Sequence, residues 1–219
     1  MHLYRLNRHL SFCEIEGTPL FLDIAGDRYF ALEGELAAAF ERLRAGQASP
    51  DDIAALKAAD MIEPTPHQRP IAPAPPHVPR ASLVEQRERV GKAGAGLPFL
   101  IAADLLRVRL VLRRGGLAHL IASVREQKSR AAAGRRPEAA LEELAGAYSV
   151  ARSLVPLARN CLSDSLTFIR LLALRGHHPD LVLGVKRNPF AAHCWVQTDT
   201  LVLNDSADSA RDFTPVLVV

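Results

Sequence analysis

The stretch Arg159–Phe168, RNCLSDSLTF, places a single cysteine directly after an asparagine, at the start of a helical pattern. Asparagine is a favourable helix N-cap, so Cys161 should lie in the first turn, where unpaired backbone N–H groups and the helix dipole favour a thiolate. Apolar residues then recur at helical spacing, and the pattern stops at Gly176. Cys161 is therefore either a small buried hydrophobic residue or a nucleophile whose position is fixed by the core.

The residues after Gly176 change to a strand-like pattern, in three runs at residues 180–187, 192–205 and 214–219. His193 lies at the start of the second run, and Asp205 lies at its end. A hairpin that turns near residues 199–200 brings these ends side by side, so the carboxylate can hold the imidazole while its other nitrogen faces a thiol. We therefore predict a site with Cys161 as nucleophile, His193 as base and Asp205 as the residue that orients the base.

The chain divides at a proline-rich segment, residues 64–80, which contains seven prolines and has no periodicity. Such a segment runs extended as a semi-rigid spacer, so we take residues 66–81 as a linker between domains at 1–65 and 82–219. In the second domain, helical patterns cover residues 82–91, 97–114, 117–130, 137–157 and 161–175 before the three strands. Helices followed by a small antiparallel sheet predict an α+β fold.

The first domain begins with an alternating pattern that is cut at residues 17–19 and 26–27, which predicts three short antiparallel strands. Helical patterns follow at residues 33–46 and from Ser49, where serine can act as the N-cap and Pro50 occupies the first helical position. A unit of about 65 residues with three strands and a few helices is too small for a cleft of its own. We interpret it as a binding module.

Composition and charge narrow the function further. The 219 residues are 48% hydrophobic, which is enough for a substantial core, and the three widely spaced cysteines include no CxxC pair, so neither a disulfide framework nor a zinc knuckle is expected. No secretory signal or membrane span is visible, and we expect a cytoplasmic protein. Residues 1–65 carry a net charge of −5 and the remainder +8. Aromatic residues are only 5% of the chain, which argues against nucleic acid as the partner of the basic helices and for an acidic protein partner.

The segment from Asn160 to Asp205 resembles the B proteins of lasso peptide biosynthesis, whose peptidase domain has a transglutaminase and papain-like fold. The sequences CLSDSL, LALRGHHPDLVLGV, PFAAHCWV and VLND carry this resemblance. Less specifically, residues 1–65 resemble the recognition element of ribosomal peptide pathways, a small winged-helix module whose third strand takes up a leader peptide. The resemblance implies a fused B protein that holds both parts.

This resemblance implies a cysteine peptidase that removes the leader of a ribosomal precursor peptide, so that a cyclase related to asparagine synthetases can close a ring on the freed core peptide. It implies no metal and no cofactor. We expect the leader to bind on the third strand, at Arg28, Tyr29 and Phe30, with Leu56 of the following helix closing the groove. Of Tyr29 and Phe30, which alternate in direction, one should face the core and the other the peptide or solvent.

Three alternatives remain open at this point. The same three residues could perform transglutaminase or arylamine acetyltransferase chemistry. The chain could instead be a non-catalytic scaffold that presents a peptide, with Cys161 structural. A zinc site from Cys161, His193 and Asp205 is disfavoured, because no HxxxH or CxxC spacing preorganises it.

Overall fold

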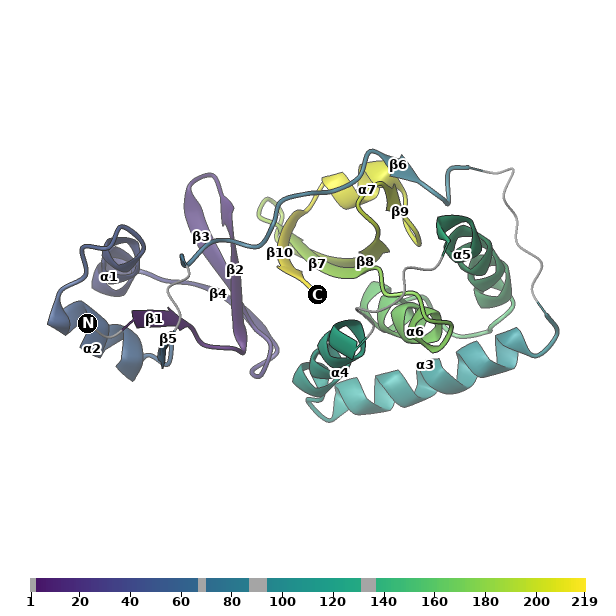
Figure 1. Ribbon diagram of the computed structural model, residues 1–219, viewed down its shortest axis with the longest axis horizontal. Helices are drawn as coiled ribbons and strands as arrows, with labels where there is room; N and C mark the ends of the chain where they lie inside the picture. Colours follow the sequence, from purple (N-terminus) through teal and green to yellow (C-terminus); the bar gives the residue numbers. More distant parts are fainter. Residues whose placement is uncertain (1–2, 67–69, 87–93, 131–136) are drawn as a thin grey trace.

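The computed structural model describes residues 3–66, 70–86, 94–130 and 137–219, which form two lobes joined by an extended segment (Figure 1). The smaller N-terminal lobe comprises residues 3–66, and the larger C-terminal lobe comprises residues 81–219. Helices and small, mainly antiparallel sheets are mixed in both lobes, which confirms the predicted α+β class.

The N-terminal lobe contains a three-stranded antiparallel sheet in the order β2-β3-β4, two helices and a two-stranded ribbon of β1 with β5. The elements are β1 (Leu3–Leu6), β2 (Leu10–Ile15), β3 (Thr18–Asp23), β4 (Arg28–Ala31), α1 (Gly34–Arg44), α2 (Pro50–Ala58) and β5 (Ile62–Thr65). The three predicted strands and both helices are present, and α2 starts at the predicted Ser49 cap, where the Ser49 hydroxyl accepts a hydrogen bond from Asp52 N at 3.1 Å. The β1–β5 ribbon was not predicted, because its two strands come from opposite ends of the lobe's sequence and pair only in the folded chain.

The C-terminal lobe packs helices against a five-stranded sheet in the order β10-β7-β8-β9-β6. Helix α6 lies against β7 and β8, and three further helices surround α6. The elements are β6 (Ala81–Ser82), α3 (Leu97–Arg113), α4 (Leu117–Arg130), α5 (Glu138–Ser153), α6 (Cys161–Leu174), β7 (Asp180–Lys186), β8 (Ala191–Gln197), β9 (Leu201–Val202), α7 (Ala207–Arg211) and β10 (Thr214–Val218).

One predicted helix of this lobe is wrong where the structure describes it. Residues 81–82 form β6, which pairs in parallel with β9, and residues 83–85 form a turn, whereas a helix was expected over 82–91. The Ser82 hydroxyl donates a hydrogen bond to the Asp205 carbonyl, and this contact with the sheet explains the strand. The remainder of the expected helix, residues 87–91, lies outside the described residues.

Residues 70–80 of the proline-rich segment run extended between the lobes and form hydrogen bonds to both of them (Figure 1). Ala74 N donates to the carbonyl of Phe12 in β2 at 2.8 Å, and Gln197 Nε2 of β8 donates to the carbonyl of His77 at 3.0 Å. Such contacts remove much of the freedom that a linker of this length would otherwise have. The segment thus serves as a strap across the junction of the lobes (Figure 1).

The two lobes share a hydrophobic core, which the sequence did not predict. One face of the N-terminal sheet carries the aromatic core of its own lobe, whereas Cys13, Leu22 and Ile24 on the other face are buried in the core of the C-terminal lobe. Strand β10 packs across β2, and the Ser11 hydroxyl donates a hydrogen bond to the Val216 carbonyl. The lobes are therefore packed in one defined orientation rather than connected only by a tether.

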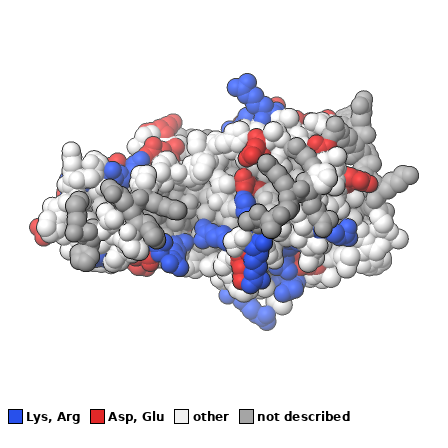
Figure 2. Space-filling model, viewed as in Figure 1, with Lys and Arg blue, Asp and Glu red and all other residues white. Residues whose placement is uncertain are grey.

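Charges are distributed unevenly over the face in Figure 2, where basic side chains gather along the lower edge of the C-terminal lobe. In the N-terminal lobe, arginines are engaged by nearby carboxylates: Arg42 pairs with Asp52 at 2.6 Å, and Arg44 pairs with Glu14 at 2.5 Å. On this face, basic side chains are thus more prominent along the C-terminal lobe, which carries the positive net charge.

Candidate active site

Helix α6 begins at Cys161 in the way the sequence indicates. Asn160 has an extended backbone, and its side-chain oxygen accepts a hydrogen bond from Ser163 N at 3.0 Å, which makes it the N-cap. In return, Asp164 Oδ2 accepts a hydrogen bond from Asn160 N at 2.9 Å. This reciprocal cap fixes the first turn, and with it the position of the half-buried Cys161.

The β8–β9 hairpin brings His193 and Asp205 together. His193 lies in β8 opposite Gly184 of β7, and Asp205 lies shortly after the end of β9 at Val202. His193 Nε2 and Asp205 Oδ2 form a hydrogen bond, with the two side chains 18% and 24% exposed. The Cys161 thiol lies close enough to His193 for the imidazole to lower the pKa of the thiol. Since Asp205 occupies Nε2, the remaining ring nitrogen, Nδ1, is the one available to the thiol. The three residues predicted from spacing therefore form one connected cluster.

The environment of this cluster favours a thiolate and an imidazolium. The hydrogen bond from His193 is the main reason that the pKa of Cys161 falls below that of a free thiol, and it outweighs the opposing effect of burial. The hydrogen bond to Asp205, followed by that to Cys161, raises the pKa of His193 to about 9. Burial alone would raise the pKa of Asp205, but the His193 contact and the Ser206 N–H lower it. The charged forms thus stabilise one another.

The other two cysteines have the opposite character. Burial raises the pKa of Cys13 to about 11, and it also raises the pKa of Cys194, whose side chain is 3% exposed. Cys194 points to the face of β8 opposite His193, toward α6. These two thiols are structural by environment.

This contrast gives a first prediction on pH dependence. At pH 7, iodoacetamide should alkylate Cys161 at least about tenfold faster than Cys13 or Cys194, because the thiolate is the reactive form. As the pH rises through about 9, His193 should lose the proton that its raised pKa retains at neutral pH, so any reaction that needs this proton should be lost. Mass spectrometry of the digested protein measures the labelling, and equal labelling of the three thiols would contradict the prediction.

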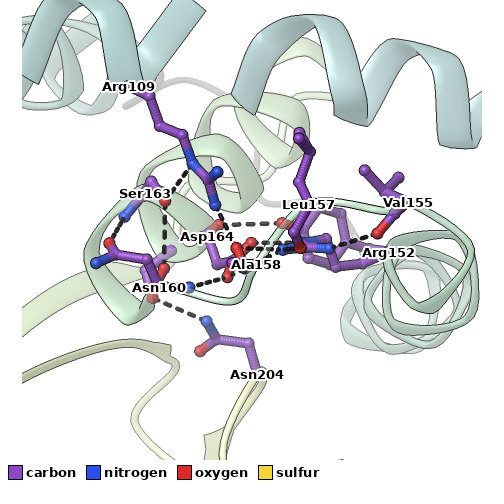
Figure 3. Close-up of polar contacts among 11 residues, drawn as sticks. Arg109, Arg152, Val155, Leu157, Ala158, Asn160, Ser163, Asp164 and Asn204 are labelled. Carbon is purple, nitrogen blue, oxygen red and sulfur yellow. Dashed lines mark hydrogen bonds and ion pairs between the residues drawn. The ribbon is translucent and has the colours of Figure 1, made fainter. Parts of the chain in front are cut away.

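A buried arginine supports the loop that precedes the nucleophile (Figure 3). Arg152, near the end of α5, is 2% exposed and donates from Nε to Asp164 Oδ1 at 2.5 Å. It also donates to the carbonyls of Val155 at 3.2 Å, Leu157 at 3.0 Å and Ala158 at 3.3 Å. One guanidinium therefore holds both the turn after α5 and the carboxylate that caps α6. The role of Arg152 was not predicted, because its burial depends on tertiary contacts.

A second polar network holds α6 against the hairpin. The Ser165 hydroxyl donates to the Cys194 carbonyl at 2.9 Å and accepts from Asn204 Nδ2 at 2.9 Å, while Asn204 Oδ1 accepts from Val196 N at 2.8 Å. Ser165 is fully buried, so each of these bonds would be costly to lose. Because the network joins the helix of Cys161 to the strand of His193, it sets the spacing between nucleophile and base.

Aromatic residues flank the imidazole. The Phe213 ring lies 5.0 Å and the Trp195 ring 5.9 Å from His193. A side chain at Gly184 would approach Trp195 to 2.7 Å, so the close approach of these rings requires glycine there. The surrounding rings exclude water from one side of His193.

The residues expected to bind a leader have different environments. Arg28 is exposed and pairs with Asp23 at 3.1 Å, and Phe30 faces the lobe's own core, where it stacks on Phe21 at 5.2 Å. Tyr29 faces the C-terminal lobe. Leu56 is 0% exposed, so the expectation that it closes an open groove is wrong: its helical face is packed inside the N-terminal core. Strand β4 ends its sheet, and among the described residues no strand pairs with its outer edge.

With this geometry established, comparison with known proteins identifies the family. Residues 102–218 match the model of the transglutaminase-like superfamily, and the chain belongs to this superfamily. Cysteine-based catalysis is typical of its members. Comparisons with curated proteins and with solved structures give no significant match.

The described part of the chain has neither a membrane-spanning helix nor a metal-binding cluster. None of its helices combines the length and apolar character needed to cross a bilayer. No group of three or more histidine, cysteine or acidic side chains in it is arranged to hold a metal ion.

Proposed function

We propose that this chain is a cysteine peptidase that removes the leader from a ribosomally made lasso precursor peptide in the cytoplasm, using Cys161, His193 and Asp205. The observation that carries the proposal is the hydrogen bond between His193 and Asp205 beside Cys161, whose thiol pKa His193 lowers, at a capped helix start. The transglutaminase-like family supports the cysteine chemistry. The leader peptide and a separate asparagine-synthetase-like cyclase are the proposed partners.

In the proposed reaction, the Cys161 thiolate attacks the scissile carbonyl and the carbonyl oxygen becomes an oxyanion. His193 then gives its proton to the leaving amine, which departs as the new N-terminus and leaves an acyl group on sulfur as a thioester. Neutral His193 next removes a proton from water, and the resulting hydroxide releases the leader as a carboxylic acid and restores the thiol. Asp205 keeps the imidazole oriented and stabilises its charged form throughout.

The start of α6 also offers a site for the oxyanion. The backbone N–H of Cys161 is in the first turn, where it has no partner within the helix. An N–H group fixed in this way stabilises the negative charge that develops in the transition state. The reciprocal cap at Asn160 and Asp164 keeps this N–H in place.

The N-terminal lobe supplies the proposed leader site. An extended peptide can add to the open outer edge of β4 through main-chain hydrogen bonds, and neighbouring side chains then select its sequence. Arg28 is at the start of this strand with its side chain 70% exposed, so it is available to such a peptide. Phe30 acts indirectly, by fixing β4 on the aromatic core.

The test of the whole proposal is a cleavage assay. The full-length protein is incubated with the synthetic precursor encoded beside its gene, and the products are identified by mass spectrometry. Two fragments whose masses sum to the precursor plus one water support the peptidase. Incorporation of an added amine without hydrolysis would instead indicate acyl transfer, and an intact precursor that binds would indicate a scaffold.

A prediction for the leader site uses two similarly exposed arginines. Arg28→Ala should weaken leader binding about tenfold, the cost typical of losing one charge-assisted contact. Arg130→Ala on α4, an arginine whose side chain is 76% exposed and paired with Glu126, should leave binding unchanged. Titration of a fluorescent leader peptide into each full-length variant measures the affinities. Equal affinities for the two variants would place the leader elsewhere.

A further inference from the structure

Tyr29 connects the N-terminal lobe to the catalytic cluster. On β4 it is turned away from its own lobe and packs against the core of the C-terminal lobe. That core also includes the buried Cys194, and the half-buried Cys161 packs against it as Tyr29 does. A residue of the N-terminal lobe thus lies in the neighbourhood of the nucleophile.

Phe190 lies on the other side of this contact. It ends the turn between β7 and β8, three residues before His193, and its ring meets the Tyr29 ring edge to face with centroids 5.6 Å apart. Phe190 is 55% exposed, although a large apolar side chain that packs on a neighbour is more often covered. One side of the aromatic pair is therefore open to a ligand.

Each ring of the Tyr29–Phe190 pair is held in place by a different lobe. Phe190 is held by the strand that carries His193, and Tyr29 is held by the core shared between β2, β3 and β10. Strand β4 also carries the proposed leader edge. A leader bound along β4 would have to run from this strand to Cys161, and the aromatic pair lies between the two elements concerned, because Tyr29 belongs to β4 and Phe190 directly precedes the strand of His193.

We propose that Tyr29 and Phe190 together form a specificity site for the apolar side chains that immediately precede the scissile bond, so that the N-terminal lobe completes the substrate cleft of the peptidase. This inference rests on the proposed function, because it takes Cys161 as the nucleophile. The rings contribute apolar contact and shape, and neither residue takes part in bond making.

Three thiol reagents test the specificity site and the proposed nucleophile by separate measurements. Acetyl-Leu-Leu and acetyl-Gly-Gly chloromethyl ketones place apolar or minimal residues on the acyl side, whereas iodoacetamide reports only the reactivity of Cys161. The parent should react with the Leu-Leu reagent at least about tenfold faster than with the Gly-Gly reagent, the selectivity typical of a hydrophobic pocket. Phe190→Ala and Tyr29→Ala should reduce this ratio to about twofold or less without changing the iodoacetamide rate.

Two further variants serve as controls for the loss of the hydroxyl alone and for the loss of an exposed ring elsewhere. Tyr29→Phe retains the ring and should keep the preference, while Phe99→Ala removes a 78% exposed ring on α3 and should leave every rate unchanged. Because Phe190 is exposed, its replacement tests the site even where loss of Tyr29 unfolds the protein. A preference that survives in Phe190→Ala, or that is lost in Tyr29→Phe, overturns the aromatic site. Failure of iodoacetamide to label parental Cys161 overturns the proposed nucleophile instead.

Discussion

Replacing Cys161 by alanine should abolish precursor cleavage, lowering the rate by about three orders of magnitude or more, because no other group can form the thioester. Leader binding should persist at the parental affinity, since β4 lies on the other lobe and does not depend on the sulfur. Cleavage is measured by mass spectrometry at saturating enzyme, and binding is measured by titration of a labelled leader. Cleavage above a few per cent of the parental rate would contradict the assignment of the nucleophile.

Variants of the other two residues provide a graded control. His193→Ala removes the proton carrier and should cost nearly as much as loss of Cys161, while Asp205→Asn leaves the base in place and should be milder. Iodoacetamide labelling of Cys161 at pH 7 should slow in His193→Ala, because the hydrogen bond that lowers the thiol pKa is lost. Negligible effects of both changes on cleavage would remove His193 and Asp205 from the mechanism.

The parts of the site that could be predicted are those with local signals. The cap at Asn160 acts within one helical turn, so it is visible in four consecutive residues. His193 and Asp205 lie 12 positions apart on one hairpin. The two ends of a hairpin lie side by side whatever surrounds them. Only the approach of Cys161, 32 residues before His193, required tertiary structure, and there the resemblance to a known family supplied the order of the elements.

The residues that could not be predicted act through contacts between distant segments. The direction of Tyr29 depends on contacts such as that with Phe190, which lies more than 100 residues away in the sequence, and no pattern within β4 distinguishes its two faces. Leu56 was expected to close a groove, whereas it is buried by an aromatic core that comes from helix α1 as well as from the three strands. Arg152 has no local signal in the sequence that distinguishes it from an exposed helical arginine. Its burial follows from the loop that folds over it.

Arg152 gives the second large prediction. Arg152→Met should lower the free energy of unfolding by about 3–5 kcal/mol, the usual cost of removing one partner from a buried ion pair, because Asp164 would remain in place with its charge uncompensated. The loop carbonyls at residues 155–158 would also lose their donor. Since Asp164 caps the helix at Asn160, the first turn should loosen and cleavage by the folded fraction should fall. Urea unfolding and cleavage assays measure the two effects.

Helix α6, which carries Asp164, offers both a matched control for this prediction and a rescue variant. Arg170, two turns further along α6, pairs with Asp104 of α3 at 3.2 Å, but both side chains keep nearly a fifth of their surface exposed. Arg170→Met should therefore be less destabilising and should leave the cleavage rate of the folded protein unchanged. Adding Asp164→Asn to Arg152→Met removes the stranded charge and retains an acceptor for Asn160, so the double variant should be more stable than Arg152→Met alone. If the double variant is instead less stable than the single one, the loss at Arg152 comes from side-chain packing rather than from an uncompensated charge, and the proposed support of the nucleophile by this ion pair is wrong.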